Sequence, residues 1–212
     1  MTDMVELFRK YGCDKGDTGS ECHLYNLEYE PEMEKRRNDS IKILEIGIFK
    51  GTSLNAWHEY FPNAEIYGID IFTRLKPSDV PALALDRVHY LKGDSTNASI
   101  TKMIADAWGK DIRFDYIIDD GLHTPDANRL TFNHIIPYLA EDGVFYIEDA
   151  WPLHIMTTKE MKNPWIKSRA DRYNSLTMSR FLDALQSYNV EEIDLRKQSK
   201  KEDSFIFKVT KK

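Results

Sequence analysis

The sequence predicts an α/β fold, in which a Rossmann-like, doubly wound and mostly parallel sheet ends in a C-terminal antiparallel hairpin within a single domain. Three observations support this prediction. Short apolar runs alternate with segments of helical spacing along most of the chain. The first run is apolar almost throughout and ends in a glycine, as is typical of a strand buried on both faces. Acidic residues stand at the ends of the predicted strands, where open α/β sheets bind their ligands.

The apolar pattern assigns each element to a residue range. Runs rich in β-branched and aromatic residues, bounded by turn residues, predict parallel strands over residues 41–48, 64–71, 88–94, 114–120 and 143–149. Helical spacing of apolar residues predicts helices over residues 51–61, 99–108, 126–139 and 175–189. Two final strands, 190–196 and 204–210, flank a polar segment, and this arrangement predicts the antiparallel hairpin.

Two segments lie outside this alternation. Residues 1–40 contain two segments of helical character around a turn-rich stretch, and we expect them to cover the same domain, because they are few for a domain of their own. Residues 41–212 would then form the domain proper. The stretch 150–173 holds two prolines, two tryptophans and several basic residues. We expect a long loop there, and such loops are usually functional.

Composition excludes several classes of protein. The chain has 212 residues with a net charge of −6, whereas a general nucleic-acid binder carries a basic excess. No apolar run approaches the roughly 20 residues that span a membrane, and the N-terminus lacks the apolar core of a signal peptide. Cys13 and Cys22 make no zinc-ligand pattern and are expected to be free thiols. We therefore expect a cytoplasmic protein; the sequence leaves a homo-oligomer open.

A glycine turn follows the first predicted strand. Gly47 ends the strand and Gly51 opens the next helix, so the backbone can turn tightly and a ligand can approach it closely. The dinucleotide pattern G-x-G-x-x-G is absent, because Ile48, Phe49 and Lys50 follow Gly47. A pyrophosphate group is therefore not expected at this turn.

Acidic residues accompany the first three strands. Glu45 precedes the glycine turn and fits a cationic ligand better than a phosphate. Asp70 ends the second strand and suits hydrogen bonding to both hydroxyls of a ribose. Asp94 follows the third strand, where an adenine would lie. S-adenosylmethionine has a ribose, an adenine and a sulfonium charge but no phosphate, so the pattern favours it as the cofactor.

Two pairs of acids end the fourth and fifth strands, which are neighbours in a doubly wound sheet. "IIDDGLH" supplies Asp119 and Asp120, and "YIED" supplies Glu148 and Asp149. Close carboxylates repel each other unless a cation compensates them, and an all-oxygen set suits Mg²⁺. Side chains alternate along a strand, so one of the first pair can bind the metal while the other faces the cofactor or holds a loop.

His123 follows the fourth strand in the turn after these acids. An imidazole, with an ordinary pKa of about 6.5, suits a general base near neutral pH. A metal that binds an acceptor hydroxyl lowers the pKa of that hydroxyl, and His123 could then take the proton. A lone histidine is more often a surface or capping residue, but the neighbouring carboxylates favour the catalytic interpretation.

At this point the sequence resembles the metal-dependent sugar O-methyltransferases of macrolide biosynthesis. The motifs are "DYIIDDGLHTPD", "GVFYIEDAW", "YGCDKG" and "LEIGIFKGTSLNAW". The resemblance implies that 41–212 is an S-adenosylmethionine-dependent methyltransferase domain with a sugar-containing acceptor. It implies Mg²⁺ ligands at Asp120, Glu148 and Asp149 and a base at His123. It implies that S-adenosylmethionine lies against the glycine turn, Gly47 and Gly51, with Asp70 at the ribose. With the strand-end acids Glu45, Asp94 and Asp119, these residues make up the predicted cofactor site.

The resemblance extends to the N-terminal segment. It implies that Asp14 to Gly16, with His23 and Tyr25, cover the cofactor or the acceptor; the alternative is a purely structural lid. In the loop after the fifth strand, five basic residues and two tryptophans suggest contacts with an anionic sugar acceptor, although a solvated basic face is the simpler interpretation. These residues are Trp151, Lys159, Lys162, Trp165, Lys167, Arg169 and Arg172.

Three other functions remain open at the level of sequence. A methyltransferase for a catechol or another vicinal diol would use the same metal chelation. A hydroxylase related to the cephamycin-pathway proteins shares the general sequence type, and iron and 2-oxoglutarate would separate it from methyl transfer. A cofactor-binding module without catalysis would be favoured by loss of the base or the metal acids, and all of them are present.

Overall fold

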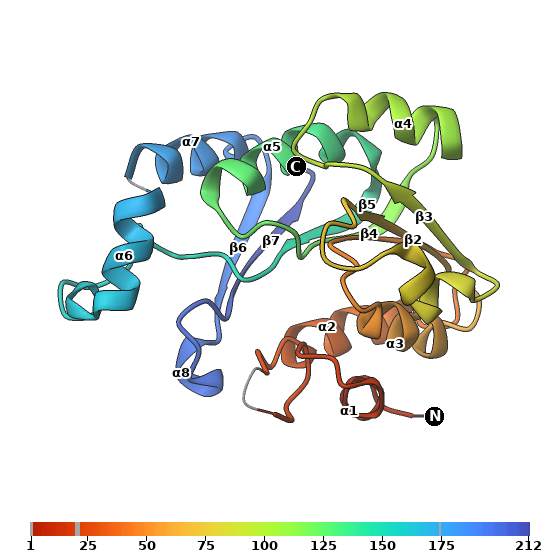
Figure 1. Ribbon diagram of the computed structural model, residues 1–212, viewed down its shortest axis with the longest axis horizontal. Coiled ribbons are helices and arrows are strands. Elements are labelled where there is room, and N and C mark those ends of the chain that lie inside the picture. Colours follow the sequence, from red (N-terminus) through yellow and green to blue (C-terminus); the bar gives the residue numbers. More distant parts are fainter. Residues whose placement is uncertain (1, 20–21, 174) are drawn as a thin grey trace.

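The chain forms one seven-stranded sheet with helices on both faces (Figure 1). This computed structural model describes residues 2–19, 22–173 and 175–212. The strand order is β3-β2-β1-β4-β5-β7-β6, with β1 to β5 parallel and β7 antiparallel to both of its neighbours. The strands are β1 (Lys42–Ile46), β2 (Glu65–Asp70), β3 (Val88–Lys92), β4 (Phe114–Asp119), β5 (Leu139–Ile147), β6 (Asn189–Asp194) and β7 (Phe205–Thr210). The predicted fold class, including the C-terminal hairpin, is confirmed.

The helices divide into two layers. On one face lie α1 (Met4–Tyr11), α2 (Asn26–Met33) and α3 (Thr52–Tyr60), and on the other lie α4 (Ser99–Trp108), α5 (Pro125–Ile135) and α7 (Ser175–Leu185) (Figure 1). Alternation along the strands feeds both layers: Ile43 of β1 belongs to the first hydrophobic core and Leu44 to the second. Burial of large apolar side chains in two layers is the main stabilising contribution, at roughly 1.5–3 kcal/mol for each.

The N-terminal segment shares the first core with the sheet. Phe8 of α1 packs edge-on against Trp57 of α3, with ring centroids 5.3 Å apart. Tyr29 of α2 contacts both Trp57 and Tyr146 of β5, at 5.9 and 4.7 Å. All four rings are fully buried. Helices α1 and α2 are therefore packed against α3 and against β5, one of the strands whose ends carry the predicted site.

Several elements differ from the sequence prediction. Helix α7 ends at Leu185, four residues before the predicted end. The strand β5 begins at Leu139, because β4 pairs with it from Phe114 across an irregularity in the register. Helix α5 ends at Ile135 and continues as the 3₁₀ turn η4 (Ile136–Tyr138), since Pro137 cannot donate the next helical hydrogen bond. The connection between β6 and β7 contains the short helix α8 (Arg196–Ser199).

A long loop was expected over residues 150–173, but the structure also contains helical elements there. These are the 3₁₀ turn η5 (Glu160–Lys162) and the helix α6 (Pro164–Tyr173). Asn163 accepts a hydrogen bond from the backbone N–H of Trp165, and Pro164 fits the first helical position. Ile166 is buried against Trp151 in a small separate core. The sequence pattern did not predict this helix, because it has too few apolar residues to show helical spacing.

No helix in the described parts of the chain is both long and apolar enough to cross a membrane. Two further 3₁₀ turns, η2 (Pro77–Asp79) and η3 (Pro81–Ala84), connect β2 to β3, and η1 (Glu34–Arg36) follows α2.

Candidate active site

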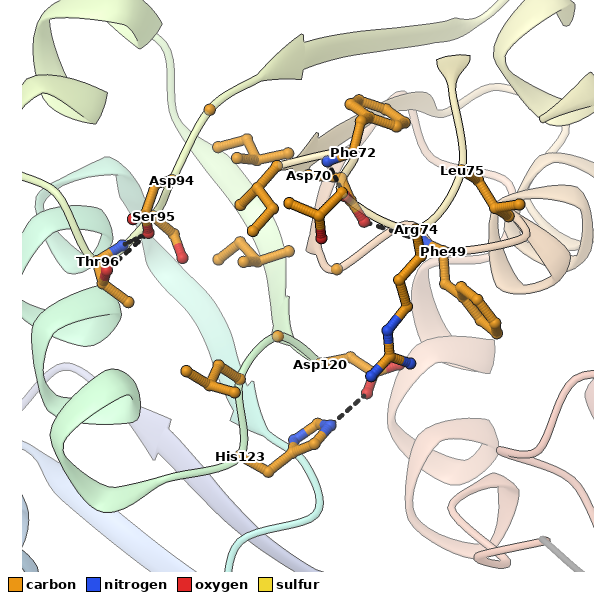
Figure 2. Close-up of a pocket in the computed structure, with 18 of the residues that line it drawn as sticks. Phe49, Asp70, Phe72, Arg74, Leu75, Asp94, Ser95, Thr96, Asp120 and His123 are labelled. Carbon is orange, nitrogen blue, oxygen red and sulfur yellow. Dashed lines mark hydrogen bonds and ion pairs between the residues drawn. The ribbon is translucent and has the colours of Figure 1, made fainter. Parts of the chain in front are cut away.

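A pocket of about 670 Å³ lies beyond the carboxyl ends of the parallel strands. Figure 2 shows side chains from several strand ends converging on it. Its volume lies within the range of small-molecule sites, about 300–1,000 Å³. Six of the predicted site residues line it: Gly47, Asp70, Asp94, Asp120, His123 and Asp149.

The Asp70 carboxylate organises one wall of the pocket. Its Oδ2 accepts hydrogen bonds from the backbone N–H groups of Ile48 and Phe49, at 2.8 and 3.0 Å, and its Oδ1 accepts from the N–H of Phe72 (Figure 2). A carboxylate has about four acceptor positions, so little capacity remains for a ligand. Asp70 therefore fixes the turn after β1 as well as facing the pocket.

Gly47 is required by the packing of two strand ends. Its φ is 91°, and a Cβ atom there would lie 2.0 Å from the carbonyl oxygen of Asp120. Any side chain would push β1 away from the acids at the end of β4. Gly51, with a φ of 71°, instead packs against Val80 and Ala82 and does not line the pocket.

Strand alternation separates Asp119 from Asp120. Asp119 is buried and accepts a hydrogen bond from the side-chain amide of Asn128 in α5, at 3.1 Å. Burial raises the pKa of Asp119 to about 6. Asp120 lies on the opposite side and lines the pocket. Asp119 thus holds α5 and the loop after β4, which was one of the two roles open to it.

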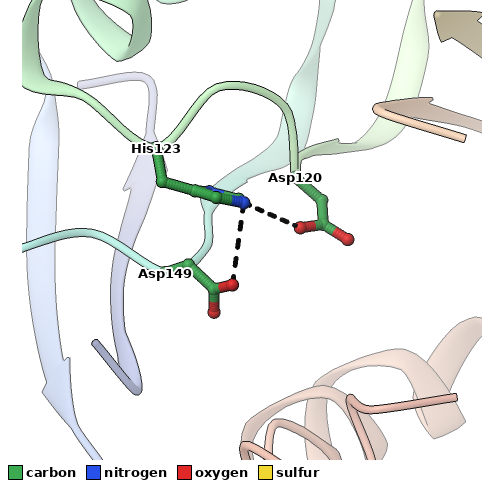
Figure 3. A group of neighbouring side chains, drawn as sticks. All are labelled: Asp120, His123 and Asp149. Carbon is green, nitrogen blue, oxygen red and sulfur yellow. Dashed lines mark ion pairs between the residues drawn. The ribbon is translucent and has the colours of Figure 1, made fainter. Parts of the chain in front are cut away.

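Asp120, His123 and Asp149 form an open centre at the edge of the pocket (Figure 3). One ligand atom from each lies within 4.8 Å of the other two. The Nε2 of His123 is 3.6 Å from Asp120 Oδ1 and 3.7 Å from Asp149 Oδ2. Burial by itself would lower the pKa of His123, but the nearby carboxylates of Asp149 and Asp120 raise it above its ordinary value.

Asp149 is held in an unusual backbone conformation. Its φ is 50°, in the left-handed region, which aspartate tolerates better than most residues. The hydroxyl of Tyr25 accepts from the N–H of Asp149 at 3.1 Å and donates to Asp149 Oδ1. His23 Nδ1 lies 3.2 Å from the same oxygen and 2.9 Å from the hydroxyl of Ser204. These contacts leave Asp149 Oδ2 facing His123.

Lys15 is buried between three acids. Its Nζ lies 2.6 Å from Asp120 Oδ2, donates a short hydrogen bond to Glu148 Oε2, and lies 3.6 Å from Glu45 Oε1. The other oxygen of Glu148 accepts from the hydroxyl of Tyr29. Burial raises the pKa of Glu148 well above its ordinary value, although Lys15 opposes the shift.

Glu45 and Glu148 are therefore not part of the pocket wall. Glu45 points from β1 toward α3, where it accepts a hydrogen bond from Trp57 Nε1 at 2.9 Å, and burial raises its pKa to about 7. Its position does not support direct contact with a cofactor in the pocket. Lys15 and Tyr29 were not among the predicted site residues, although "DKG" had been noted; their contacts depend on long-range folding.

The basic residues after β5 lie elsewhere. Lys159, Lys162 and Lys167 are exposed and do not line the pocket. The side chains of Arg169 and Arg172 lie outside the part of the chain that the structure describes. The segment is tied to the C-terminal hairpin by ion pairs of Glu160 with Arg196, at 3.0 Å, and of His154 with Glu192, at 3.1 Å.

Comparisons with known proteins identify the family of the chain. Residues 44–150 match the family described as a methyltransferase domain. The chain is 32% identical over 156 residues to the mycinamicin VI 2''-O-methyltransferase of Micromonospora griseorubida, covering 70% of this chain and 36% of that protein. It is 31% identical over 156 residues to a tetracenomycin-C rhamnosyl 3'-O-methyltransferase of Streptomyces olivaceus, covering 70% and 37%. The chain therefore spans just over a third of these curated relatives.

Solved structures show the same fold. The MycE methyltransferase of the mycinamycin biosynthetic pathway, solved with Mg and S-adenosylhomocysteine (SAH), gives a TM-score of 0.69 at 24% identity, covering 99% of this chain and 55% of that one. The SAH-bound Podospora anserina methyltransferase PaMTH1 gives 0.60 at 16% identity, covering 100% and 89%. The family match covers half of the chain, from the strand that carries Gly47 to the acids after β5, and on this ground the chain belongs to the methyltransferase-domain family.

Proposed function

We propose that this chain is an S-adenosylmethionine-dependent, Mg²⁺-dependent O-methyltransferase that acts on a sugar hydroxyl of a glycoside or nucleotide sugar. The observation that carries the proposal is the open centre, in which one free oxygen each of Asp120 and Asp149 faces the imidazole of His123 at the pocket edge. Three curated relatives are named as O-methyltransferases of a rhamnosyl tetracenomycin-C, of L-olivosyl-oleandolide and of mycinamicin VI.

The residues of the open centre fit a magnesium ion. Mg²⁺ prefers carboxylate oxygens and keeps several waters, so two carboxylates at an accessible pocket edge are a suitable donor set. We propose Asp120 and Asp149 as ligands and Glu148 as the third acid of the site, held at the rear by Lys15 and Tyr29. When bound, the ion would supply Lewis-acid polarisation of an acceptor hydroxyl.

His123 provides the base in this proposal. Its Nε2 faces the open centre, where an acceptor hydroxyl would be bound, and it takes the hydroxyl proton as the oxygen becomes nucleophilic. The N–H of His123 that this creates lies beside Asp120 and Asp149, whose negative charges stabilise the imidazolium. When bound, S-adenosylmethionine would supply the methyl group: its carbon–sulfur bond would break, with the electron pair left on sulfur, as the acceptor oxygen bonds to the methyl carbon.

The other half of the pocket suits the cofactor. Gly47, Asp70 and Asp94 lie there beside the apolar side chains of Ile46 and Ile69. We propose that S-adenosylmethionine binds along this wall, with Gly51, Glu45 and Asp119 supporting it from outside the lining. Calorimetry should show binding of SAH and much weaker binding of NAD; tight binding of NAD alone would contradict the assignment.

Product analysis tests the reaction itself. Mass spectrometry of rhamnosides and nucleotide sugars, incubated with the protein, S-adenosylmethionine and Mg²⁺, should show a gain of one methyl group on the sugar. EDTA should abolish turnover, and added Mg²⁺ should restore it. Methylation of a catechol in preference to every glycoside would show that the acceptor is a catechol-like molecule and not a sugar. Full turnover in EDTA would show that the reaction needs no metal ion.

A further inference from the structure

The N-terminal segment places a buried cation against the acidic centre, outside the pocket lining. Lys15 is 2% exposed and does not line the pocket, yet its ammonium group contacts Asp120 and Glu148 directly. A lysine buried to this degree is uncommon unless it is paired. Lys15 precedes these partners by 105 and 133 residues, so the tertiary fold brings them together.

The contacts of Lys15 determine which carboxylate oxygens remain free. Asp120 gives Oδ2 to Lys15 and turns Oδ1 toward His123. Glu148 has both oxygens occupied, one by Lys15 and the other by the hydroxyl of Tyr29. Asp149 is held separately, through Tyr25. The oxygens that face His123, Asp120 Oδ1 and Asp149 Oδ2, are therefore those that Lys15 and Tyr25 do not contact.

We propose that Lys15 is a positioning residue of the metal centre: it holds Asp120 and Glu148 so that one oxygen of Asp120 is presented with Asp149 to a divalent cation. The inference rests on the proposed function for the identity of the ion as Mg²⁺. It adds a residue from outside the acid and histidine motifs. It also makes Lys15, together with Tyr25, a part of the site's construction.

Two physical effects of removing Lys15 have opposite signs, and this allows a decisive experiment. If Lys15 acts only as a positive charge near the ion, its removal relieves repulsion and tightens metal binding. If Lys15 orients the ligands, its removal weakens binding, as loss of an outer-shell partner typically costs about 10–100-fold in affinity. The direction of the change separates positioning from simple charge.

The test uses the whole chain, Mn²⁺ and two lysine variants. Mn²⁺ takes the same oxygen ligands as Mg²⁺, and its free concentration can be followed by electron paramagnetic resonance. Lys15→Met should weaken Mn²⁺ binding by about 10–100-fold, while SAH affinity changes little. Lys10→Met removes an exposed lysine that pairs with Glu59 and should leave Mn²⁺ binding unchanged.

A second variant covers the case in which Lys15→Met does not fold. Lys15→Met leaves buried acids without their cation, so the double variant with Glu45→Gln removes one acid as well and preserves the net charge of the group. It should also bind Mn²⁺ at least tenfold more weakly. Unchanged or tighter binding in a folded variant overturns the role of Lys15. Absence of Mn²⁺ binding in the unmodified protein would instead overturn the metal site in the proposed function.

Discussion

The two carboxylates of the open centre, Asp120 and Asp149, use their two oxygens for different purposes. Asp149 gives one oxygen to Tyr25 and His23 and turns the other toward His123. Asp120 divides its oxygens in the same way between Lys15 and His123. Because a protein-held oxygen cannot reorient, the free oxygens are directed before any ligand arrives. Preorganisation of this kind lowers the cost of binding a cation and of stabilising a new charge.

Replacing His123 tests the proposed base. His123→Ala should lower the rate of the chemical step by about 10²–10⁴, because positioned proton removal is worth that much. The unmodified protein should lose activity on the acid side, where the imidazole is protonated, and the variant should lack this limb. Single-turnover rates across pH at saturating Mg²⁺ measure both effects. A loss below about tenfold with the acid limb intact would assign the proton to water instead.

The backbone of Phe49 predicts a change in stability. Phe49 has a φ of 46° at the pocket and is 48% exposed, so its ring gains little burial in return for a left-handed conformation. That conformation costs an L-residue about 1–2 kcal/mol, of which glycine recovers a part. Phe49→Gly should raise the free energy of unfolding by about 0.5–1 kcal/mol in urea titration. Lys200, which lies away from the pocket, has a φ of 61°, so Lys200→Gly should raise the free energy of unfolding by a similar amount. If Phe49→Gly lowers the free energy of unfolding while Lys200→Gly raises it, the Phe49 ring makes stabilising contacts that outweigh the backbone strain.

Sequence position alone identified one part of the site and missed another. Asp120, His123 and Asp149 follow adjacent parallel strands, and the carboxyl ends of such strands share one sheet edge. Lys15 could not be assigned in this way, since it lies in a turn-rich segment with no strand to fix its register. Glu45 was assigned to the cofactor from its place before Gly47, but strand alternation turns it toward α3.

The hydroxyl of Tyr25 connects the start of α2 to Asp149, which follows β5. This hydroxyl accepts from the N–H of Asp149 and donates to its carboxylate, in a buried setting. Tyr25→Phe leaves a buried N–H without a partner, which costs about 1–3 kcal/mol. We expect a lower melting temperature and weaker Mn²⁺ binding. Tyr11→Phe, which removes an exposed bond to Glu59, is the control; equal melting temperatures for both variants would exclude this role of Tyr25.

Elements with strong periodicity were the easiest to predict. The helix predicted over 99–108 matches α4 at both ends, because a clear apolar face and Gly109 define it. Helix α6 was missed because its position depends on Ile166 packing against Trp151, a tertiary contact. The start of β5 at Leu139 depends on pairing with β4 in the same way.

On the scale of the whole molecule, folding brings together acidic side chains that repel each other when they are ionised. Burial raises the pKa of Glu45 to about 7 and that of Asp119 to about 6, and it raises the pKa of Glu148 well above its ordinary value. A carboxyl group with a higher pKa in the folded state binds its proton more tightly there than in the unfolded chain. It therefore contributes stability at low pH, which is lost as the pH rises through the folded-state pKa.

This linkage predicts how stability depends on pH and on metal. For Glu45 the loss spans about pH 4.5 to 7, and for Asp119 it spans about pH 3.8 to 6. The raised pKa of His123 acts in the same direction. Without metal, the melting temperature should therefore fall between about pH 4.5 and 7, by about 2–4 °C for each kcal/mol lost.

A divalent cation should reduce this fall, because it stabilises the ionised carboxylates that folding brings together. Melting curves measured every half unit of pH, in EDTA and in excess Mg²⁺, should diverge most at the alkaline end. Glu45→Gln cannot titrate at that position, so its profile in EDTA should be flatter between about pH 5 and 7. A melting temperature that stays level or rises with pH in EDTA would contradict the raised pKa values, because a carboxyl group with a raised pKa loses stability across this range.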